Sequence, residues 1–166
     1  MTVEQTLFRE AMSTLAASVT IITTDGTGGR HGMTATAVCS VSDEPATVLA
    51  CINRSSTMNA RVKENGVMCL NVLGGQHQDL SMLFANSRIS IEERFAKARW
   101  GRSATGSPVL EDALIALDCE VSEVTEVGTH SVFFGRLVDL AVASQHAPLL
   151  YFGRGFHTLK PQSAVA

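Results

Sequence analysis

The segment VTIITTDGTGGRHGMTATAVCSVS, residues 19–42, decides the fold class. Its first six and last twelve residues have the alternation and β-branched content of strands, and the glycine-rich DGTGGR between them is a turn. A dinucleotide-binding glycine turn opens a helix, whereas a strand follows this one. The segment therefore predicts a β-hairpin with a loose tip.

The rest of the chain continues this pattern. Further strands are predicted over residues 47–53, 67–73, 113–124, 130–142 and 148–152, and helices over 4–17 and 56–66, with a more helical, polar segment at 76–100. About six strands and a few short peripheral helices, without regular βαβ alternation, predict a mainly β fold, an antiparallel closed or split barrel. A single domain is expected over residues 1–166.

Composition narrows the function classes. The 166 residues are 45% hydrophobic and only 17% charged, which favours a compact body with a buried oligomer interface. A net charge of −3 without a cluster of Lys and Arg argues against nucleic-acid binding. The N-terminal helix carries Leu7, Phe8, Ala11, Met12 and Leu15 at helical spacing, and this stripe is expected to pack in the core.

Two further sequence patterns concern targeting and metal binding. Glu4, Arg9 and Glu10 interrupt any apolar signal segment, and no apolar run of about 18 residues follows, so we expect a cytoplasmic protein without a membrane partner. The four cysteines and five histidines lack metal-ligand spacing, and the cysteines sit in strand-like runs. We therefore expect buried reduced thiols and no metal site.

Residues 31–42 carry the first candidate site. Strand alternation places Thr34, Thr36, Val38 and Ser40 on one face, and Met33, Ala35, Ala37, Cys39 and Val41 on the other. A strand of small and hydroxyl-bearing residues allows a flat ligand to lie close to the backbone. The alternative is an ordinary solvated strand.

Residues 51–66, CINRSSTMNARVKENG, carry the second candidate site. A strand ends at Asn53, and Ser55, Ser56 and Thr57 then stand where a helix begins, beside Arg54. Free N–H groups and the positive end of the helix dipole favour a phosphate there. Simple N-capping by Ser55 or Ser56 is the alternative.

Two further candidates lie late in the chain. His130 follows a Gly-Thr turn where a strand begins, a position typical of a barrel rim, although a solvated turn histidine would look the same. Phe156 stands with other aromatics around a Gly-Arg-Gly turn and could equally plug the barrel or a dimer seam.

In this order, HGMTATAVCSVSDEP, CINRSSTMN, GTH and PLLYFGRGFH resemble the short-chain flavin reductase family, from about Phe8 to His157. The segments FREAMSTLAASVTIITT and FANSRISIEERF look most like the subgroup with the reductase component of 4-hydroxyphenylacetate 3-monooxygenase and the related reductase of pyrimidine breakdown. The resemblance implies a homodimer of FMN-binding split barrels that uses NADH or NADPH to reduce FMN or FAD for a separate oxygenase.

The resemblance also implies roles for individual residues. Thr34, Ala35, Thr36, Ala37 and Val38 would line the isoalloxazine ring. The ribityl chain and phosphate would be held by Ser40, Asn53, Ser55, Ser56 and Thr57, with Arg54 adding charge beside the phosphate. His130 would contact the nicotinamide or the flavin edge as a positioning and electrostatic residue, with Phe156 nearby. Thr129 stands where the family's turn often carries Asp.

Two other functions are compatible with these residues. One is an FMN-bound oxidase or direct reductase of an organic substrate, which would turn over without releasing flavin. The other is a non-enzymatic flavin-binding or partner-binding module, which would bind flavin without oxidising NADH or NADPH.

Overall fold

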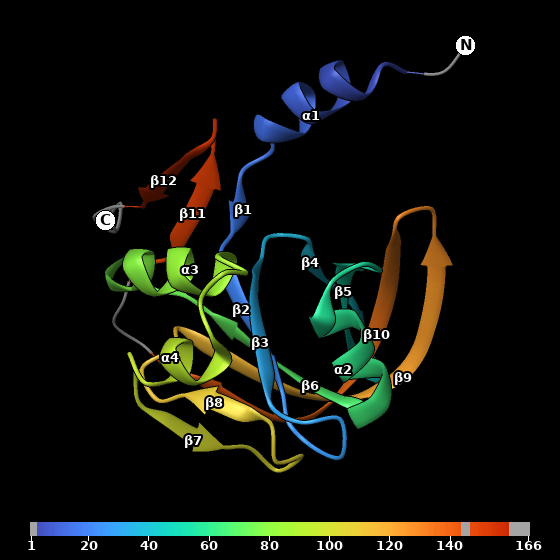
Figure 1. Ribbon diagram of the computed structural model, residues 1–166, viewed down its shortest axis with the longest axis vertical. Helices are drawn as coiled ribbons and strands as arrows, with labels where there is room; N and C mark the ends of the chain where they lie inside the picture. The colour runs from blue at the N-terminus through green and yellow to red at the C-terminus, as the bar shows by residue number, and fades with distance from the viewer. Residues whose placement is uncertain (1–2, 144–146, 160–166) are drawn as a thin grey trace, which may run out of the picture.

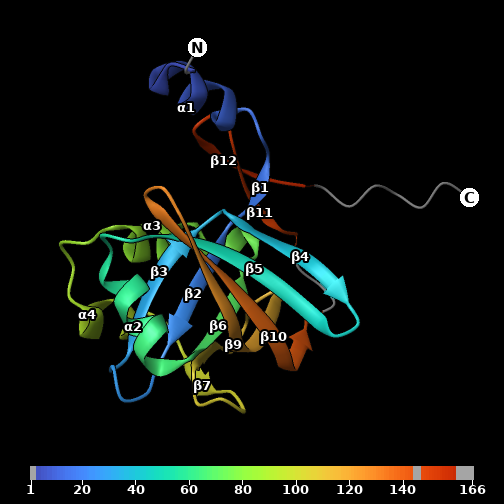
Figure 2. The same ribbon diagram turned by 90° about the vertical axis from the view of Figure 1, so that its right-hand side faces the viewer.

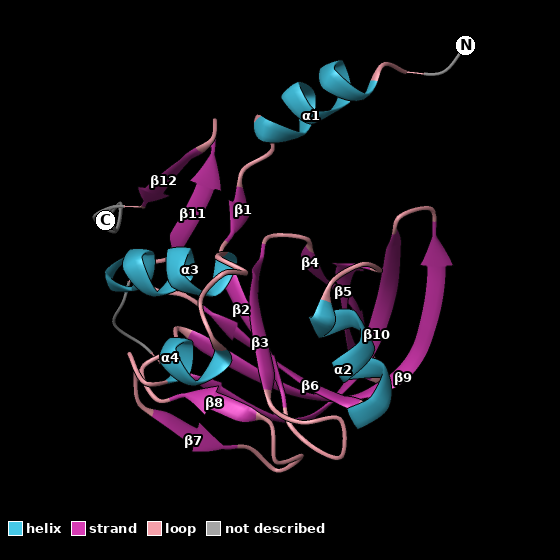
Figure 3. Cartoon of the chain, viewed as in Figure 1, coloured by secondary structure: helices cyan, strands magenta, loops and turns pink. Residues whose placement is uncertain are grey.

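The computed structural model describes residues 3–143 and 147–159. Its main body is an antiparallel sheet with the strand order β3-β2-β6-β9-β10-β5-β4 (Figure 1). The strands are β2 (Thr20–Thr24), β3 (His31–Ala35), β4 (Val38–Asp43), β5 (Ala46–Asn53), β6 (Val67–Val72), β9 (Ile115–Val127) and β10 (His130–Val142). Strands dominate and the helices are short (Figure 3), so the predicted mainly β fold is confirmed.

A corner at Thr36 and Ala37 separates β3 from β4, which lie at opposite edges of the sheet. The prediction of one continuous strand over residues 31–42 is wrong, because the first half pairs with β2 and the second half with β5. The amide of Val38 donates to the carbonyl of Thr36 at 3.0 Å, which tightens the corner. Within the described sheet no ladder joins β3 to β4, and the barrel is therefore split there.

Strand β2 is buried on both faces because it separates two cores. Ile22 faces the barrel interior, whose other buried members are Val48, Ala50, Ile52, Met58, Val62, Met68, Leu70, Cys119 and Phe133. Ile21 faces the opposite way, as alternation along a strand requires. Its cluster also contains Val19, Leu73, Leu80, Phe84, Phe95, Leu110, Ala113 and Leu149. The second core supports α3 (Gln78–Ala85) and α4 (Ile91–Phe95).

Helix α2 (Thr57–Asn65) contributes Met58 and Val62 to the barrel core. Ser56 is its N-cap, and its side chain accepts a hydrogen bond from the amide of Asn59 at 3.3 Å. Gly66 ends the helix in the left-handed conformation, with φ of 69°, as the sequence predicts. The start of α2 is thereby fixed at the end of β5.

Helix α1 (Gln5–Ser13) forms as predicted but projects away from the barrel (Figures 1 and 2). The expected packing of its apolar stripe in the core is wrong: the residues of α1 include none that is buried, and Leu7 and Phe8 are 58% and 54% exposed. The helix precedes β1 (Ala17–Ser18) in the chain and extends beyond the barrel, so its apolar side does not pack against either core of the described chain. The stripe therefore remains available to another surface.

Two smaller sheets complete the fold. One consists of β1, β11 (Leu149–Phe152) and β12 (Gly155–Thr158), and the other of β7 (Trp100–Arg102) and β8 (Pro108–Leu110). A short 3-10 turn, η1 (Gly75–His77), precedes α3. None of the helices in the described ranges is both long enough and apolar enough to cross a membrane.

The cysteines are all free thiols, but not all are buried. Cys69 and Cys119 lie in the barrel wall, and burial raises the pKa of the Cys119 thiol to about 12. Cys51 is half-buried, and Cys39 is exposed because its neighbour Val38 packs against the barrel core and alternation turns Cys39 to the other face of β4. The expectation of four buried thiols is therefore wrong for Cys39 and met only in part at Cys51.

Candidate cofactor-binding site

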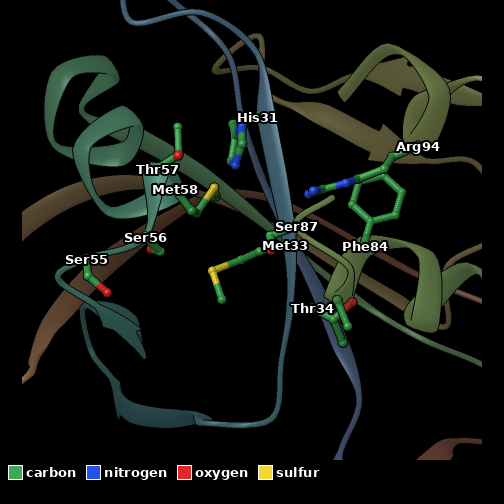
Figure 4. Close-up of a pocket in the computed structure, with 11 residues that line it drawn as sticks. His31, Met33, Thr34, Ser55, Ser56, Thr57, Met58, Phe84, Ser87 and Arg94 are labelled. Carbon is green, nitrogen blue, oxygen red and sulfur yellow. The ribbon is translucent and has the colours of Figure 1, made fainter. Parts of the chain in front are cut away.

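A cavity of about 380 Å³ lies between β3, the start of α2 and the α3–α4 region (Figure 4). Its lining residues come from these elements and the loop after α3: His31, Met33, Thr34, Ser55, Ser56, Thr57, Met58, Phe84, Ala85, Ser87 and Arg94. Ser55, Ser56 and Thr57 lie on one side of this first cavity, and Arg94 points in from the other. The two sides together offer hydrogen-bond donors and a cation to an anionic group.

The hydroxyl side belongs to the loop between β5 and α2. The side chain of Asn53 accepts hydrogen bonds from the amide and the hydroxyl of Ser55, at 2.9 and 2.8 Å. The hydroxyl of Ser56 donates to the carbonyl of Asn53 at 2.8 Å while it caps α2. Capping therefore occurs at Ser56, and the loop also presents Ser55 and Thr57 to the cavity. The N-terminus of α2 faces the same space and favours negative charge.

Arg94 supplies the cation, and sequence reasoning did not single it out. Its side chain donates to the carbonyls of Ile89, Gly32 and Asn86, at 3.0, 3.2 and 2.7 Å. The residue is only 5% exposed, and it forms no ion pair with any carboxylate of the described chain. Burial lowers the pKa of the Arg94 guanidinium. A buried cation held only by carbonyl dipoles is a strong site for an anion.

His31 points into the same cavity from β3 (Figure 4). Burial lowers the pKa of His31 below its usual value, and the charges of Arg94 and Arg61 lower it further. An anion bound beside His31 would oppose these effects and favour the protonated ring. The first cavity therefore holds one fixed cation and one group that can become a second.

A second cavity, of about 310 Å³, adjoins the first and shares Thr34 and Ala85 with it. The rest of its lining is mostly apolar: Val19, Ala35, Thr36, Ser81, Met82, Tyr151 and Phe156. The rings of Tyr151 and Phe156 meet edge to face, with centroids 5.3 Å apart. Thr34 stands between the cavities and donates its hydroxyl hydrogen to the carbonyl of Ser81 at 2.6 Å. One end of the combined groove is cationic and the other is apolar and aromatic.

The turn that carries His130 lies next to the β5–α2 loop. His130 is paired with Asn53 across β10 and β5, and its Nδ1 is 2.9 Å from the hydroxyl of Thr129. A shallow third hollow lies beside it and is lined by Asn53, Arg54, Ser55, Gly128 and Thr129. Ser55 belongs to this hollow and to the first cavity, so the hairpin turn adjoins the groove.

The structure brings most of the sequence-derived candidates together but distributes them among these hollows. Thr34, Ser55, Ser56 and Thr57 line the first cavity, and Ala35, Thr36 and Phe156 line the second. Asn53 and Arg54 line the third hollow. The linings of these three hollows do not include Ala37, Val38, Ser40 or His130.

The structure also differs from the expectation that Thr34, Thr36, Val38 and Ser40 share one face of a strand. Val38 packs against the barrel core together with Met33 and Ala35, which alternation had placed on the opposite face. The corner at residues 36–37 resets the alternation, so Thr34 and Val38 do not share a face. His31, Phe84 and Arg94 were not found by sequence reasoning, because tertiary packing alone places β3 opposite α4.

Comparisons with known proteins agree with this geometry. The family described as "Flavin reductase like domain" matches residues 12–160. The chain is 51% identical over 164 residues to the FMN reductase (NADH) RutF of Pseudomonas syringae pv. syringae (strain B728a), covering 99% of this chain and 92% of the relative.

Solved structures extend the likeness to three dimensions. A crystal structure from Haemophilus somnus 129PT has a TM-score of 0.92 and 43% identity, covering 95% of this chain and 100% of the other. BorF, the flavin reductase component of a bacterial two-component tryptophan halogenase, has a TM-score of 0.89 and 29% identity, covering 96% of this chain and 100% of BorF.

Proposed function

Since the chain belongs to the flavin reductase like domain family, we propose that it reduces FMN with NADH and releases the reduced flavin to a separate oxygenase. The relative named above is an NADH-dependent FMN reductase, and BorF is the reductase half of a two-component system. These names support FMN and NADH as the preferred pair, where the sequence left FAD and NADPH open.

The amphipathic groove is the observation that carries this proposal. FMN has a flat, largely apolar ring at one end and a phosphate at the other, and the two adjoining cavities have the same polarity. The buried Arg94, which has carbonyl partners but no carboxylate among the described residues, would hold the phosphate with the N-terminus of α2 and the Ser55 and Thr57 hydroxyls.

The isoalloxazine ring would lie toward the second cavity, against Ala35 and Phe156. Small side chains at Ala35 and Thr36 allow a ring close to the backbone of β3. Beyond the corner, Ala37 and Val38 would contact the flavin through main-chain groups, because the side chain of Val38 packs in the core. Ser40 lies farther along β4 and would contact only the ribityl chain.

FMN held in this groove would supply the hydride acceptor: with a hydride from NADH and one proton from solvent, the products would be FMNH₂ and NAD⁺. The protein needs no obligatory acid or base for this step, so its own residues bind and orient the two substrates. His130, which neighbours the β5–α2 loop, would position the nicotinamide over the flavin edge. This role is electrostatic and geometric, and His130 forms no covalent bond.

We propose that the functional unit is a cytoplasmic homodimer. Leu7, Phe8, Met12 and Leu15 form an exposed apolar stripe on α1 and the residues just after it, and all four are close to half exposed or more. Val138, Leu140 and Val142 add a second exposed apolar row on β10. Exposed apolar rows of this kind are typical of protein interfaces, and a second copy would bury them.

The test is NADH oxidation by the purified protein with added FMN, with FAD, and with no flavin. Oxidation that depends on added FMN and saturates in it supports a reductase that uses flavin as a substrate. Activity without added flavin, and a full equivalent of flavin retained through dialysis, would support a bound prosthetic group instead. Folded protein that oxidises neither NADH nor NADPH with either flavin would refute the proposal.

A further inference from the structure

In the described chain, the outer half of β9 has a strand neighbour on one side only. The last residue pair between β6 and β9 joins Val67 to Glu120, and the amide of Val121 donates to the carbonyl of Gly66 at 2.9 Å. Beyond Val121, the described strand pairs with β10 and with no other strand. The hairpin rises past the sheet toward the Gly128–His130 turn (Figure 1). Edge segments open more readily than central ones. The backbone ladder with β5 holds the β10 side of this hairpin, so contacts of the β9 side beyond Val121 with α2 and the β5–α2 loop depend on side chains.

Glu126 provides these contacts and anchors the hairpin. Its carboxylate accepts hydrogen bonds from Lys63 Nζ on α2 and from the hydroxyl of Ser131 on β10, the latter at 2.9 Å. It is also 2.9 Å from Nε of Arg54, in the loop between β5 and α2. One carboxylate thus joins the hairpin to α2 and to the loop that lines the first cavity.

Behind this carboxylate the network becomes buried. Ser131 is fully buried, and the side-chain amide of Asn59 donates to its hydroxyl at 2.9 Å and to the carbonyl of Ile52 at 3.0 Å. The backbone amide of Asn59 donates to the hydroxyl of Ser56, which caps α2. Because buried polar networks hold fixed geometry when every member is satisfied, the start of α2 and the hairpin are set relative to each other.

Arg54 completes the connection. Its amide donates to the carbonyl of Thr129 at 2.9 Å, and its Nη1 donates to the carbonyl of Gly128 at 3.3 Å. With Nε beside Glu126, the guanidinium is engaged by the hairpin and lies outside the cavity that holds Arg94. The geometry therefore points to a positioning role for Arg54 in place of the phosphate contact inferred from the sequence.

We propose that Glu126 is a positioning residue that holds the Gly128–His130 turn at a fixed place against the Asn53–Thr57 loop. It thereby sets the nicotinamide side of the groove relative to the flavin-phosphate side. An effect of Glu126 on NADH oxidation rests on the proposed function, whereas its effect on the position of the turn does not. The hydrogen bonds from Lys63 and Ser131 hold the pKa of Glu126 below its usual range, so the carboxylate is charged at neutral pH.

The test compares Glu126→Gln with Glu120→Gln. Glu120 is the matched control because it lies on the same strand and pairs with Arg136 on β10 at 3.0 Å, far from the turn. We expect Glu126→Gln to lower kcat/KM for NADH about tenfold, since small misplacements of a positioning group have large rate effects. KM for FMN should change by less than about twofold, and Glu120→Gln should change neither. Both variants should keep the wild-type Tm, because exposed ion pairs contribute little to stability.

Amide hydrogen exchange without substrates is the second readout. Exchange at Arg54 and across residues 128–132 should be faster in Glu126→Gln than in wild type or Glu120→Gln. A wild-type protein inactive with every flavin, but with this exchange difference, would refute the proposed function and leave the anchor standing. With an active wild type, equal kinetics in the two variants would overturn the positioning role, and a kinetic loss without faster exchange would overturn it too.

Discussion

Nη1 of Arg94 donates a hydrogen bond to the carbonyl oxygen of Gly32 at 3.2 Å, joining α4 to β3 beside the first cavity. Gly32 has no room for a side chain, because an added Cβ would lie 2.7 Å from the ring of Phe84. This close approach of α3 and α4 to β3 lets a buried guanidinium reach the cavity. The positive charge is fixed by dipoles before any anion binds, and little reorganisation is needed on binding.

Replacing the Arg94 cation should lower the affinity for phosphorylated flavins much more than the affinity for riboflavin. Arg94→Met should weaken FMN binding about ten- to a hundredfold, the range of a charge-assisted hydrogen bond, and leave riboflavin binding nearly unchanged. Binding can be followed by the fluorescence of Trp100, the single tryptophan, whose ring centroid lies 5.5 Å from that of Phe84 in the cavity lining. Arg99→Met, at an exposed ion pair with Glu111, is the control. Equal losses for FMN and riboflavin would assign Arg94 a structural role.

Stability should depend on pH through His31. Its pKa in the folded protein is lowered by burial and then by Arg94 and Arg61, so the unfolded chain binds the proton more readily. Stability is therefore fully present above the usual histidine pKa of about 6.5 and falls as pH drops from there toward the folded-state pKa. The Tm should fall less in His31→Gln than in wild type between about pH 7.5 and about pH 5.5. Parallel Tm curves for the two proteins would contradict this account.

His130→Ala tests the hairpin turn directly. We expect kcat/KM for NADH to fall about tenfold while the affinity for FMN is kept, because the residue adjoins the flavin-phosphate loop without lining the first cavity. His157→Ala, an exposed histidine on β12 whose Nε2 lies 3.1 Å from the carbonyl oxygen of Phe152, is the control and should have wild-type kinetics. Unchanged kcat/KM for NADH in His130→Ala would remove this residue from the mechanism.

The barrel core should reject a methyl group at Gly135. A Cβ there would lie 2.7 Å from Cε of Met68 and 2.8 Å from Cβ of Cys119, both in the buried core. Gly135→Ala should therefore reduce the free energy of unfolding by about 1–3 kcal/mol, measured by urea denaturation. Gly101→Ala is the matched strand control, because its nearest contact would be at 4.0 Å. Equal stabilities of the two variants would show that the barrel relaxes around the methyl group.

The apolar stripe of α1 should decide the oligomeric state. Phe8→Ser combined with Met12→Ser should shift the protein from dimer to monomer in sedimentation velocity, because both side chains would lose buried apolar area at the interface. Arg9→Ser on the same helix lies off the stripe and should leave the dimer intact. A wild-type monomer, or a stripe variant that stays dimeric, would exclude this interface.

Local patterns predicted several of the strands and helices. The alternation in residues 19–24, the glycine turn and the Ser56–Gly66 caps predicted elements that the structure contains, whereas residues 31–42 form two strands, β3 and β4, in place of the single strand expected. These features depend on side-chain direction and on hydrogen bonds between near neighbours, both of which a single sequence records. The resemblance to flavin reductases rests on the same short segments.

The sequence by itself determined the antiparallel strand content and the polar loop Asn53–Thr57. Tertiary structure alone decided that β3 and β4 occupy opposite edges, that the stripe of α1 leaves the core, and that Arg54 turns toward Glu126. It also decided that Arg94 reaches the cavity 62 residues along the chain from Gly32. The physical reason is that these arrangements depend on which distant surfaces pack together, and packing partners leave no periodic signal in either segment.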